Sequence, residues 1–390
     1  MNRIAMDSTL RIALVAAVAG CGGANTPGLA RSVTDTLPGG VIRVMNSGPT
    51  AWADTNGWKL LYVRTVQPAS DAPGELISPW EIVLLNDGRL LVHDVNPTSI
   101  KVYDSTGRYL RSIGREGAGP GEYHAPEIAV VRDTLVIHDP QLTRLTVTTL
   151  DGKLVRSFPS VCCQFGLPIS VDDSARIRVA ANAPGGRGYQ WIEFTMTGDR
   201  IDSMLPPIAE PPKVWEQRTA TGSTTFYVPF AGQNQYLPLG DGMLLYGNTD
   251  RYTLLVTRRG TDTVRIFGRT GVTPIPVPST LRDSMFNLIV NGNARARNVA
   301  KLSDVPHTYP SWISAAEDGD GNIWIERRTA ADTLRTFDVF DSAGVLLGSV
   351  PAPFQRARLM SFAAGRVAVY DTDANDLPRI RIFRIDRRGH

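Results

Sequence analysis

The chain has 390 residues, of which 42% are hydrophobic and 20% are charged, and its formal net charge is +3. This hydrophobic content is enough for a core, and the scattered arginines form no dense basic run, which argues against a nucleic-acid-binding surface. Its 36 glycines and 27 prolines lie between short β-branched and aromatic runs, a composition typical of many strands joined by many turns. Three cysteines do not make a disulfide framework, so the fold depends on its hydrophobic core.

The N-terminus carries a targeting pattern. Two arginines precede an apolar run at residues 12–19, and small residues follow it, as in a secretory signal peptide. The run is shorter than the roughly 20 apolar residues of a membrane-spanning helix. Val18-Ala19-Gly20-Cys21 resembles the bacterial lipobox. The resemblance implies removal of residues 1–20 and lipid attachment to the Cys21 sulfur. An unlipidated signal peptide with a coincidental cysteine is the alternative.

The residues after Cys21 bear on location. Gly22 stands where an inner-membrane retention signal has Asp, so the resemblance implies a bacterial envelope lipoprotein on the outer membrane that faces the periplasm. The lipid anchor would make the membrane itself a partner, because several acyl chains hold a protein firmly. Residues 21–40 are polar with glycine and proline, and we expect a flexible tether there.

The first full repeat begins near residue 78 and contains four strand-like runs, at residues 81–85, 89–94, 99–104 and 109–114. Asn86-Asp87-Gly88 and Ser105-Thr106-Gly107 are hairpin turn signals between them. Four consecutive hairpin-linked strands make one blade of a β-propeller. Residues 127–158 follow the same order of runs and turns, which predicts a second blade.

The glycine of the turn between the third and fourth strands recurs along the chain, at Gly107, Gly152, Gly198, Gly260, Gly344 and Gly389. Three of the five spacings fall within the period of about 40–50 residues typical of propeller blades. The two longer spacings contain inserts at residues 205–235 and 279–309. The first insert is rich in proline and aromatic residues. The second has helical spacing, with Ser279 as the expected N-cap. Both inserts lie between a fourth strand and the next first strand.

The last repeat has only three strand-like runs before the chain stops at its turn. An unpaired edge would favour aggregation, and the isolated run at residues 58–66 can supply the missing strand. We therefore predict an all-β fold, a six-bladed β-propeller over residues 41–390 with an N-terminal strand closing the last blade and a short helical insert. A seventh blade that recruits residues 41–46 is the alternative.

Two segments carry a family resemblance. Residues 114–123, Gly-Arg-Glu-Gly-Ala-Gly-Pro-Gly-Glu-Tyr, resemble the linker between NHL-type repeats, and residues 318–324 resemble the first turn of such repeats. The chain is similar to bacterial six-bladed propeller lipoproteins of the NHL/TolB-like class. That class contains binding proteins, lactonases and lyases, so the resemblance implies the fold and leaves the function open.

Two glutamates are candidate ligands in the central channel. Glu81 and Glu127 begin the innermost strands of adjacent blades. Two carboxylates close together suit a hard cation such as Ca²⁺, and the resemblance to lactonases implies calcium at this place. The alternative is a solvated polar pair in a wet channel. No other cofactor is predicted.

Two histidines are candidate acid–base residues. His93 precedes Asp94, and His138 precedes Asp139, and an imidazole held by a carboxylate is a common catalytic arrangement. Neighbouring residues on a strand point to opposite faces, so any pairing would cross between blades. The alternative is that the aspartates cap turns while the histidines pack between blades.

The inserts and the His-Asp ends should lie on one face of the ring, which makes a roofed mouth the expected binding site. Aromatic residues of the inserts would line it, namely Trp215, Phe226, Tyr227, Tyr309 and Trp312. Arg115, in the glycine-rich loop at residues 114–123, is a further ligand candidate, although no Gly-Lys-Ser/Thr motif follows. The alternative is that this loop only spans between blades.

Cys162 and Cys163 are adjacent. A disulfide between neighbours requires a strained ring, but an oxidising envelope would favour it. A vicinal disulfide, two free thiols and a soft-metal contact all stay open.

The sequence contains neither Gly-x-Ser-x-Gly nor His-Glu-x-x-His, and it identifies no catalytic residue. We expect an envelope-anchored binding module for a small molecule or a protein. The alternative is a calcium-dependent hydrolase or lyase of lactonase type that uses the central channel.

Overall fold

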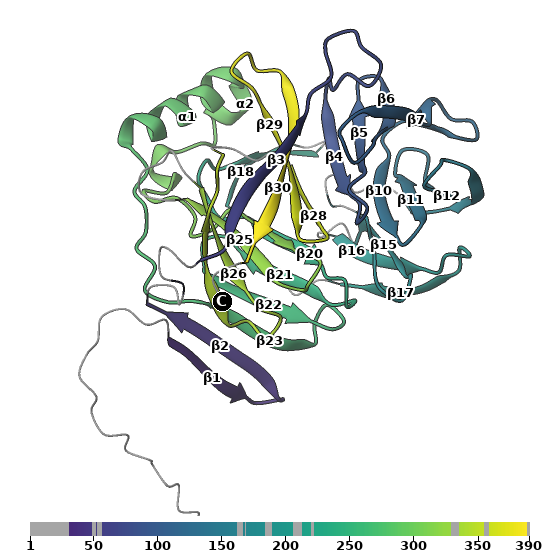
Figure 1. The fold of residues 1–390 in the computed structure, drawn as a ribbon. Coiled ribbons are helices and arrows are strands. Elements are labelled where there is room, and N and C mark those ends of the chain that lie inside the picture. The colour runs from purple at the N-terminus through teal and green to yellow at the C-terminus, as the bar shows by residue number, and fades with distance from the viewer. Residues whose placement is uncertain are drawn as a thin grey trace, which may run out of the picture.

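The computed structural model describes residues 31–48, 52, 57–161, 167, 169–183, 189–205, 213–219, 222–328, 335–354 and 359–387. Six blades, each with four antiparallel strands, are arranged around a common centre (Figure 1). The protein is a six-bladed β-propeller, as the repeat pattern predicts.

The blades follow chain order. Blade 1 contains β4 (Pro79–Leu84), β5 (Leu90–Val95), β6 (Thr98–Tyr103) and β7 (Tyr109–Ile113). Blade 2 contains β10 (Glu127–Val131), β11 (Thr134–Asp139), β12 (Arg144–Thr149) and β13 (Leu154–Pro159). Blade 3 contains β14 (Ser170–Val171), β15 (Ile177–Asn182), β16 (Tyr189–Phe194) and β17 (Arg200–Met204).

The remaining blades have the same plan. Blade 4 contains β20 (Asn234–Pro238), β21 (Leu244–Asn248), β22 (Thr253–Thr257) and β23 (Thr263–Arg269). Blade 5 contains β24 (Ser314–Glu317), β25 (Ile323–Arg328), β26 (Arg335–Phe340) and β27 (Leu346–Pro351). Blade 6 contains β28 (Leu359–Ala363), β29 (Arg366–Thr372), β30 (Pro378–Asp386) and β3 (Lys59–Val66).

The hydrophobic core lies in the seams between adjacent blades. Consecutive residues of a strand point to opposite faces of its sheet, so Leu91 packs in the seam with blade 2 while Val92 packs in the seam with blade 6. Strands buried on both faces therefore read as continuous apolar runs in the sequence, and the turns carry the polar residues.

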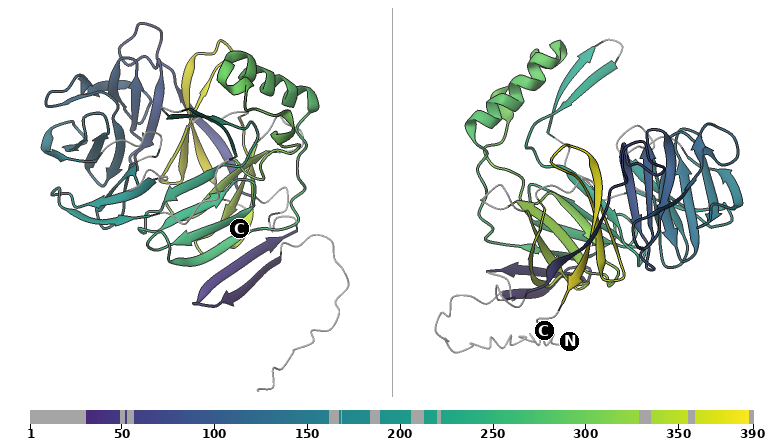
Figure 2. Two further views of the ribbon diagram at one scale, coloured as in Figure 1. Left: turned by 180° about the vertical axis from the view of Figure 1, so that it is seen from behind. Right: turned by 45° about the horizontal axis from the view of Figure 1, so that its top comes forward.

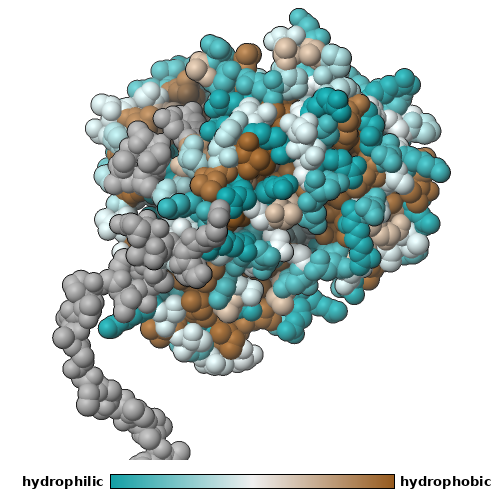
Figure 3. Space-filling view, viewed as in Figure 1, coloured by the Kyte–Doolittle hydropathy of each residue, from teal (hydrophilic) through white to brown (hydrophobic). Residues whose placement is uncertain are grey.

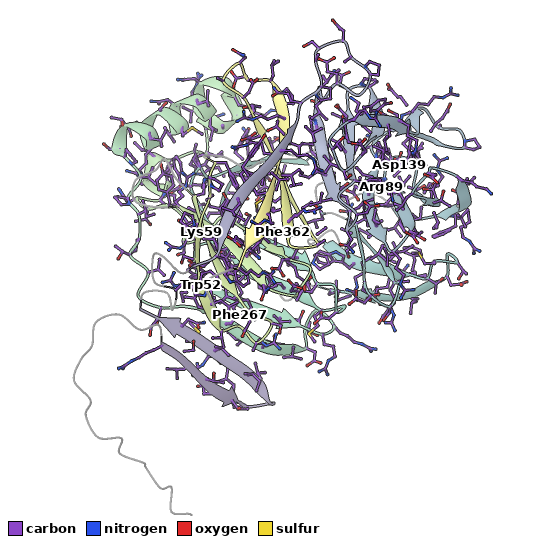
Figure 4. The ribbon with its side chains drawn as sticks, viewed as in Figure 1. Trp52, Lys59, Arg89, Asp139, Phe267 and Phe362 are labelled. Atoms are coloured by element: carbon purple, nitrogen blue, oxygen red, sulfur yellow. The ribbon has the colours of Figure 1, made fainter. Side chains whose placement is uncertain are left out.

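The recurring turn glycines set the contact between neighbouring blades. Gly344 has a φ of 88°, a left-handed conformation that favours glycine. A Cβ there would also lie 2.5 Å from Phe267 of blade 4, which Figure 4 labels. Gly107, Gly152, Gly198 and Gly260 likewise pack against the preceding blade. Their spacing therefore measures the blade repeat. Gly389 lies outside the described residues.

The ring closes through the N-terminal strand. β3 pairs antiparallel with β30, and the register places Leu60 opposite Ile385 and Tyr62 opposite Phe383. This pairing confirms the expected closure by residues 58–66. Blade 6 consequently has four strands like the others.

A second N-terminal element departs from the expectation. β1 (Arg31–Leu37) and β2 (Val41–Ser47) form a hairpin, and β2 pairs in parallel with β23 on the outer edge of blade 4. Residues 31–37 are therefore a strand where a tether was expected, and β2 builds no seventh blade. Gly39 and Gly40, which suggested flexibility, have positive φ values and form the hairpin turn.

Asn46 fixes this hairpin to two blades. Its fully buried amide donates to Gly268 O (2.9 Å) and Gly344 O (3.0 Å), and its oxygen accepts the N–H of Leu346 (2.9 Å). Hydrogen bonds to residues more than 200 positions away leave no local signal in the sequence.

Both inserts lie where the repeat pattern predicts. The first contains the hairpin β18 (Val214–Thr219) and β19 (Gly222–Tyr227), and the second contains α1 (Ser279–Gly292), α2 (Ala294–Arg297) and the 3₁₀ turn η2 (Leu302–Asp304). Ser279 is the first helical residue and not the N-cap, because the cap position is Pro278. None of the helices in the described ranges is both long and apolar enough to cross a membrane.

Candidate functional site

The two inserts pack together into one structure, which we call the cap (β18, β19, α1, α2 and η2). Its small core centres on Trp215, whose ring meets Phe286 edge to face at 5.9 Å. The Trp215 Nε1–H also donates to Asp304 Oδ2 at 2.8 Å, which joins the hairpin to η2. Figure 2 shows the helix and the hairpin projecting together from the blades.

The topology defines which face the cap occupies. In an antiparallel blade, the connection from strand four to the next strand one and the connection from strand two to strand three emerge at the same edge. Both inserts are connections of the first kind. The ends of β5 and β11 therefore lie on the same face, which we call the capped face.

The aromatic residues expected to line the mouth are mostly structural. Trp215, Tyr309 and Trp312 are only 4%, 7% and 1% exposed. Tyr309 contacts Phe230, which packs against the core of the cap, and Tyr309 lies under the Arg328 guanidinium, while Trp312 Nε1–H donates to the Arg251 carbonyl. These contacts attach the cap to blades 4 and 5.

Blades 1 and 2 carry the same pair of polar residues at the same place. The register puts Glu81 opposite His93, and it puts Glu127 opposite His138. Directly opposed residues of an antiparallel pair share a face of the sheet. The sequence correspondence between the two blades is therefore also a correspondence in space.

In blade 2 the glutamate and the histidine contact each other, and we call this pair closed. Glu127 Oε2 lies 3.1 Å from His138 Nδ1, and His138 Nε2 lies 3.4 Å from the Val161 carbonyl. Both side chains are buried. Burial raises the pKa of the Glu127 carboxyl, and its hydrogen bond with His138 acts in the opposite direction.

In blade 1 the glutamate bonds elsewhere and not to the histidine, and we call this pair open. Glu81 Oε2 accepts the Ile128 N–H of blade 2 at 2.7 Å, and burial with the nearby Glu127 carboxylate raises the pKa of Glu81 to about 8. His93 is only 1% exposed, and neither ring nitrogen has a hydrogen-bond partner among the described residues. Burial lowers the pKa of His93 to about 4, so this ring is neutral at pH 7.

The aspartates that follow the histidines cap loops. Asp94 accepts the Ile77 and Ser78 N–H groups at 2.8 and 2.9 Å and pairs with Lys101 Nζ at 2.9 Å. Asp139, labelled in Figure 4, accepts four backbone N–H groups from the loops beside it. The turn-capping alternative describes this arrangement, and neither histidine bonds to the aspartate that follows it.

An exposed tryptophan lies beside the open pair. The register shifts between Pro79 and Glu81, which makes Trp80 the extra residue of a β-bulge, and its side chain is 56% exposed. Bulges often re-aim a side chain next to a functional site. Val95, also exposed, follows His93 by two residues and shares its face of β5. We call Trp80, Glu81, His93 and Val95 the mouth cluster.

Trp80 is a residue of this cluster that is absent from the expected site residues, although the sequence contains a signal for it. Blade 1 reads Pro79-Trp80-Glu81 where blade 2 reads Pro126-Glu127. Trp80 is therefore a one-residue insertion, and the β10–β11 pairing of blade 2 has no register shift. Comparing the two copies residue by residue would have found it.

The calcium prediction rests on the two glutamates alone. Within the ranges that the structure describes, no three His, Cys, Asp or Glu side chains are placed to hold a metal ion. Glu81 accepts a backbone N–H and Glu127 contacts His138. Calcium binding stays a prediction.

Arg115 lies in the linker between blades 1 and 2. It belongs to β8 (Arg115–Glu116), which pairs with β9 (Glu122–Tyr123), and its Nε–H donates to Glu122 Oε1 at 2.9 Å. This geometry fits a spanning loop. Cys21, Cys162 and Cys163 lie outside the described residues.

Comparisons with known proteins agree with the fold. Residues 75–156, which cover blade 1 and most of blade 2, match a family model described as a 6-bladed beta-propeller. No curated protein matches the chain.

Solved structures resemble the chain only distantly. A protein described as exported, from Bacteroides fragilis, is 12% identical with a TM-score of 0.48, and the similarity covers 87% of this chain and 98% of that one. A PQQ-bound aldose sugar dehydrogenase from Streptomyces coelicolor is 13% identical with a TM-score of 0.44, over 86% and 100%. Likeness at this level carries no argument about function.

Proposed function

We propose that the protein is an envelope-anchored binding module, and that its capped face holds a small molecule or a segment of a protein at the mouth cluster. The observation that carries this proposal is Trp80. An innermost strand displays a large aromatic side chain on an inserted residue, half exposed, where the matching strand of blade 2 has none. Exposed tryptophan offers a rigid apolar contact area and is enriched among residues that dominate binding.

The groups around Trp80 indicate what an occupant needs. Val95 adds exposed apolar surface, and neither Glu81 nor His93 has a cationic partner among the described residues. A neutral imidazole offers one donor and one acceptor. An occupant with an apolar face and a hydrogen-bonding edge would match these groups.

Other exposed hydrophobic side chains do not suggest a competing site on the face drawn in Figure 3. Hydrophobic residues there occur in small groups between hydrophilic ones. Such scattered exposure is normal for a protein surface.

A ligand screen tests the proposal. Thermal shift would be measured with peptides, lactones and calcium for the wild type, Trp80→Ala and Val155→Ala. Val155 is a matched control because it is 57% exposed on the outer strand β13. We expect a stabilising compound whose shift is lost in Trp80→Ala and kept in Val155→Ala. Equal shifts in all three proteins would contradict the proposed site.

The calcium arm of the screen separates the alternative function. A rise in Tm with calcium that EDTA reverses, and that Glu81→Gln abolishes, would favour a calcium-dependent hydrolase or lyase in the channel.

The anchor has its own experiment. Labelled palmitate should enter the wild type and not Cys21→Ser, because the lipobox places the acyl groups on that cysteine and its new N-terminus. Equal labelling of both proteins would contradict the anchor.

A further inference from the structure

A second candidate site lies on the face opposite the cap, in the seam between blades 3 and 4. Two close backbone contacts join the blades at this face. The Asp173 N–H donates to the Gly240 carbonyl at 3.0 Å, and Gly260 packs so closely on Leu205 that a Cβ would lie 1.6 Å from its carbonyl oxygen. Residues next to both contacts line a cavity of about 600 Å³. This volume is within the range of small-molecule pockets.

A buried arginine forms part of the cavity lining. Arg178 is only 4% exposed, its Nε–H donates to Glu193 Oε1 at 2.6 Å, and its Nη2 lies 3.3 Å from Asp172. The Arg178 Nη1 has no hydrogen-bond partner among the described residues. A buried guanidinium is thus fixed in place with an unused donor.

The arginines at the rim have few close partners. Arg258 and Arg259 are exposed, and the Arg258 guanidinium lies 3.9 Å from Asp262, beyond hydrogen-bond distance. Arg176 lies 3.8 Å from Glu193. Within the part of the chain that the structure describes, these three side chains have guanidinium donors without a hydrogen-bond acceptor, and such donors suit a carboxylate or phosphate.

The carboxylates of the lining are largely engaged. Asp172 accepts the N–H groups of Ser174 and Arg176 and contacts Arg178, as described above. Asp202 and Asp241 each accept one backbone N–H, at 2.7 and 2.9 Å. The lining holds four arginines and four carboxylates, so the free guanidinium donors, and not a net positive field, would select the ligand.

The turn that supplies Arg258 and Arg259 breaks the pattern of the other blades. In blades 1, 2, 3 and 5 the corresponding turn begins with Asp104, Thr149, Thr195 and Asp341, and each side chain accepts N–H groups of its own turn. Blade 4 has Arg258 at this position, so its turn lacks that cap. Loss of a local structural feature in one copy of a repeat is a common sign of a functional site.

We propose that this cavity binds an organic anion, with its carboxylate or phosphate on Arg258 and Arg259 and its apolar part against Ile201 and Met204. Asp172 and Glu193 neutralise and fix Arg178, so the charged contacts to the ligand come from the two rim arginines. Ile201 is exposed and Met204 is buried in the wall of blade 3. The site is independent of the capped face.

Calorimetry with four probes of one shape tests the ligand class. Phenyl phosphate and benzoate carry an anionic group, whereas benzyl alcohol is neutral and benzylamine is cationic. We expect the two anions to bind the wild type and the other two probes not to bind. Absence of binding by both anions up to about 10 mM, well above the 1 mM range of weak specific ligands, or tighter binding of benzylamine, would overturn the proposal.

A matched pair of variants tests the residues. The double variant Arg258→Gln/Arg259→Gln should weaken phenyl phosphate binding by about tenfold or more, because charge-assisted hydrogen bonds are lost. Arg108→Gln removes one positive charge, against two in the double variant, from the equivalent turn of blade 1, where Arg108 pairs with Asp104 at 3.3 Å, and it should leave the affinity unchanged. All three arginines are exposed, so Tm should not move. Wild-type affinity in the double variant would overturn the proposal.

Discussion

Blades 1 and 2 carry the same Glu, His and Asp residues at the same positions, and they use them differently. In blade 2 Glu127 and His138 contact each other in the core, whereas in blade 1 Glu81 accepts a backbone N–H of the neighbouring blade, and His93 has no hydrogen-bond partner among the described residues. Blade 1 alone adds Trp80. The Glu–His pair is thus hydrogen-bonded in blade 2, whereas the corresponding pair in blade 1 is not, and it lies beside an exposed aromatic ring.

The open pair in blade 1 should reduce the free energy of unfolding. A buried polar group without a hydrogen bond costs about 1–3 kcal/mol, so the open pair lowers the stability of blade 1. Native proteins keep few such groups, and each one needs an explanation. Binding at the mouth cluster would supply one.

The largest expected effect on stability is at Asp94, and it should exceed the effect at Asp139, the corresponding residue of blade 2. Asp94→Ala should lower the free energy of unfolding by about 3–5 kcal/mol, because it leaves the Lys101 ammonium buried and unpaired. Asp139→Ala removes only backbone hydrogen bonds and should cost about 1–3 kcal/mol. Urea unfolding at pH 7 measures both. Equal losses would mean that Lys101 is not held by Asp94.

Substitution of the hydrogen-bonded His138 should lower the free energy of unfolding more than substitution of His93. His138→Phe leaves the Glu127 carboxyl unpaired in the core and should cost about 1–3 kcal/mol. His93→Phe removes two unpaired nitrogens and should change the free energy of unfolding by less than about 0.5 kcal/mol, or increase it. The same urea experiment applies, and a larger loss for His93→Phe would contradict the open pair.

The pH dependence of stability should report Glu81. Its pKa is raised from 4.5 to about 8 in the folded protein, so its proton contributes stability that is complete below pH 4.5 and is lost as pH rises to 8. Glu81→Gln does not titrate. Relative to this variant, the wild type should lose roughly 1–3 kcal/mol between pH 4.5 and 8, less than the full shift because Glu81 is partly exposed to solvent. Parallel pH curves for the two proteins would show that Glu81 ionises normally.

The smallest effect on stability is expected at Trp80. Trp80→Ala should change the free energy of unfolding by less than about 0.5 kcal/mol, because the side chain is mostly in water. Trp324→Ala is the contrast, since Trp324 is fully buried between blades 5 and 6 and should cost about 3–5 kcal/mol. A comparable loss at Trp80 would show that its ring has a structural role.

The sequence predicts the ring well, because its signals are local. Hairpin turns with a glycine mark each blade, and the incomplete last repeat requires the strand at residues 58–66. The β1–β2 hairpin on blade 4 escapes prediction, because its parallel pairing and the bonds of Asn46 join distant segments.

The residues of the candidate site are less predictable, because burial and strand register determine which side chains are exposed and which lie opposite each other. Trp215, Tyr309 and Trp312 look like mouth residues in the sequence, but packing between the cap and the blades buries them. Trp80 looks like an ordinary strand residue until blades 1 and 2 are aligned, which shows a one-residue insertion that the register places in a bulge. The Glu and His positions could be aligned from the sequence, but not their different partners.

Two matched double-mutant cycles test most directly whether blade 1 is open where blade 2 is closed. The cycles combine Glu127→Gln with His138→Phe and Glu81→Gln with His93→Phe, with the free energy of unfolding measured in urea at pH 7. We predict a coupling energy of about 1–3 kcal/mol in blade 2 and below about 0.5 kcal/mol in blade 1. Equal coupling in the two blades would contradict the open pair and remove the physical basis for a binding site at the mouth cluster.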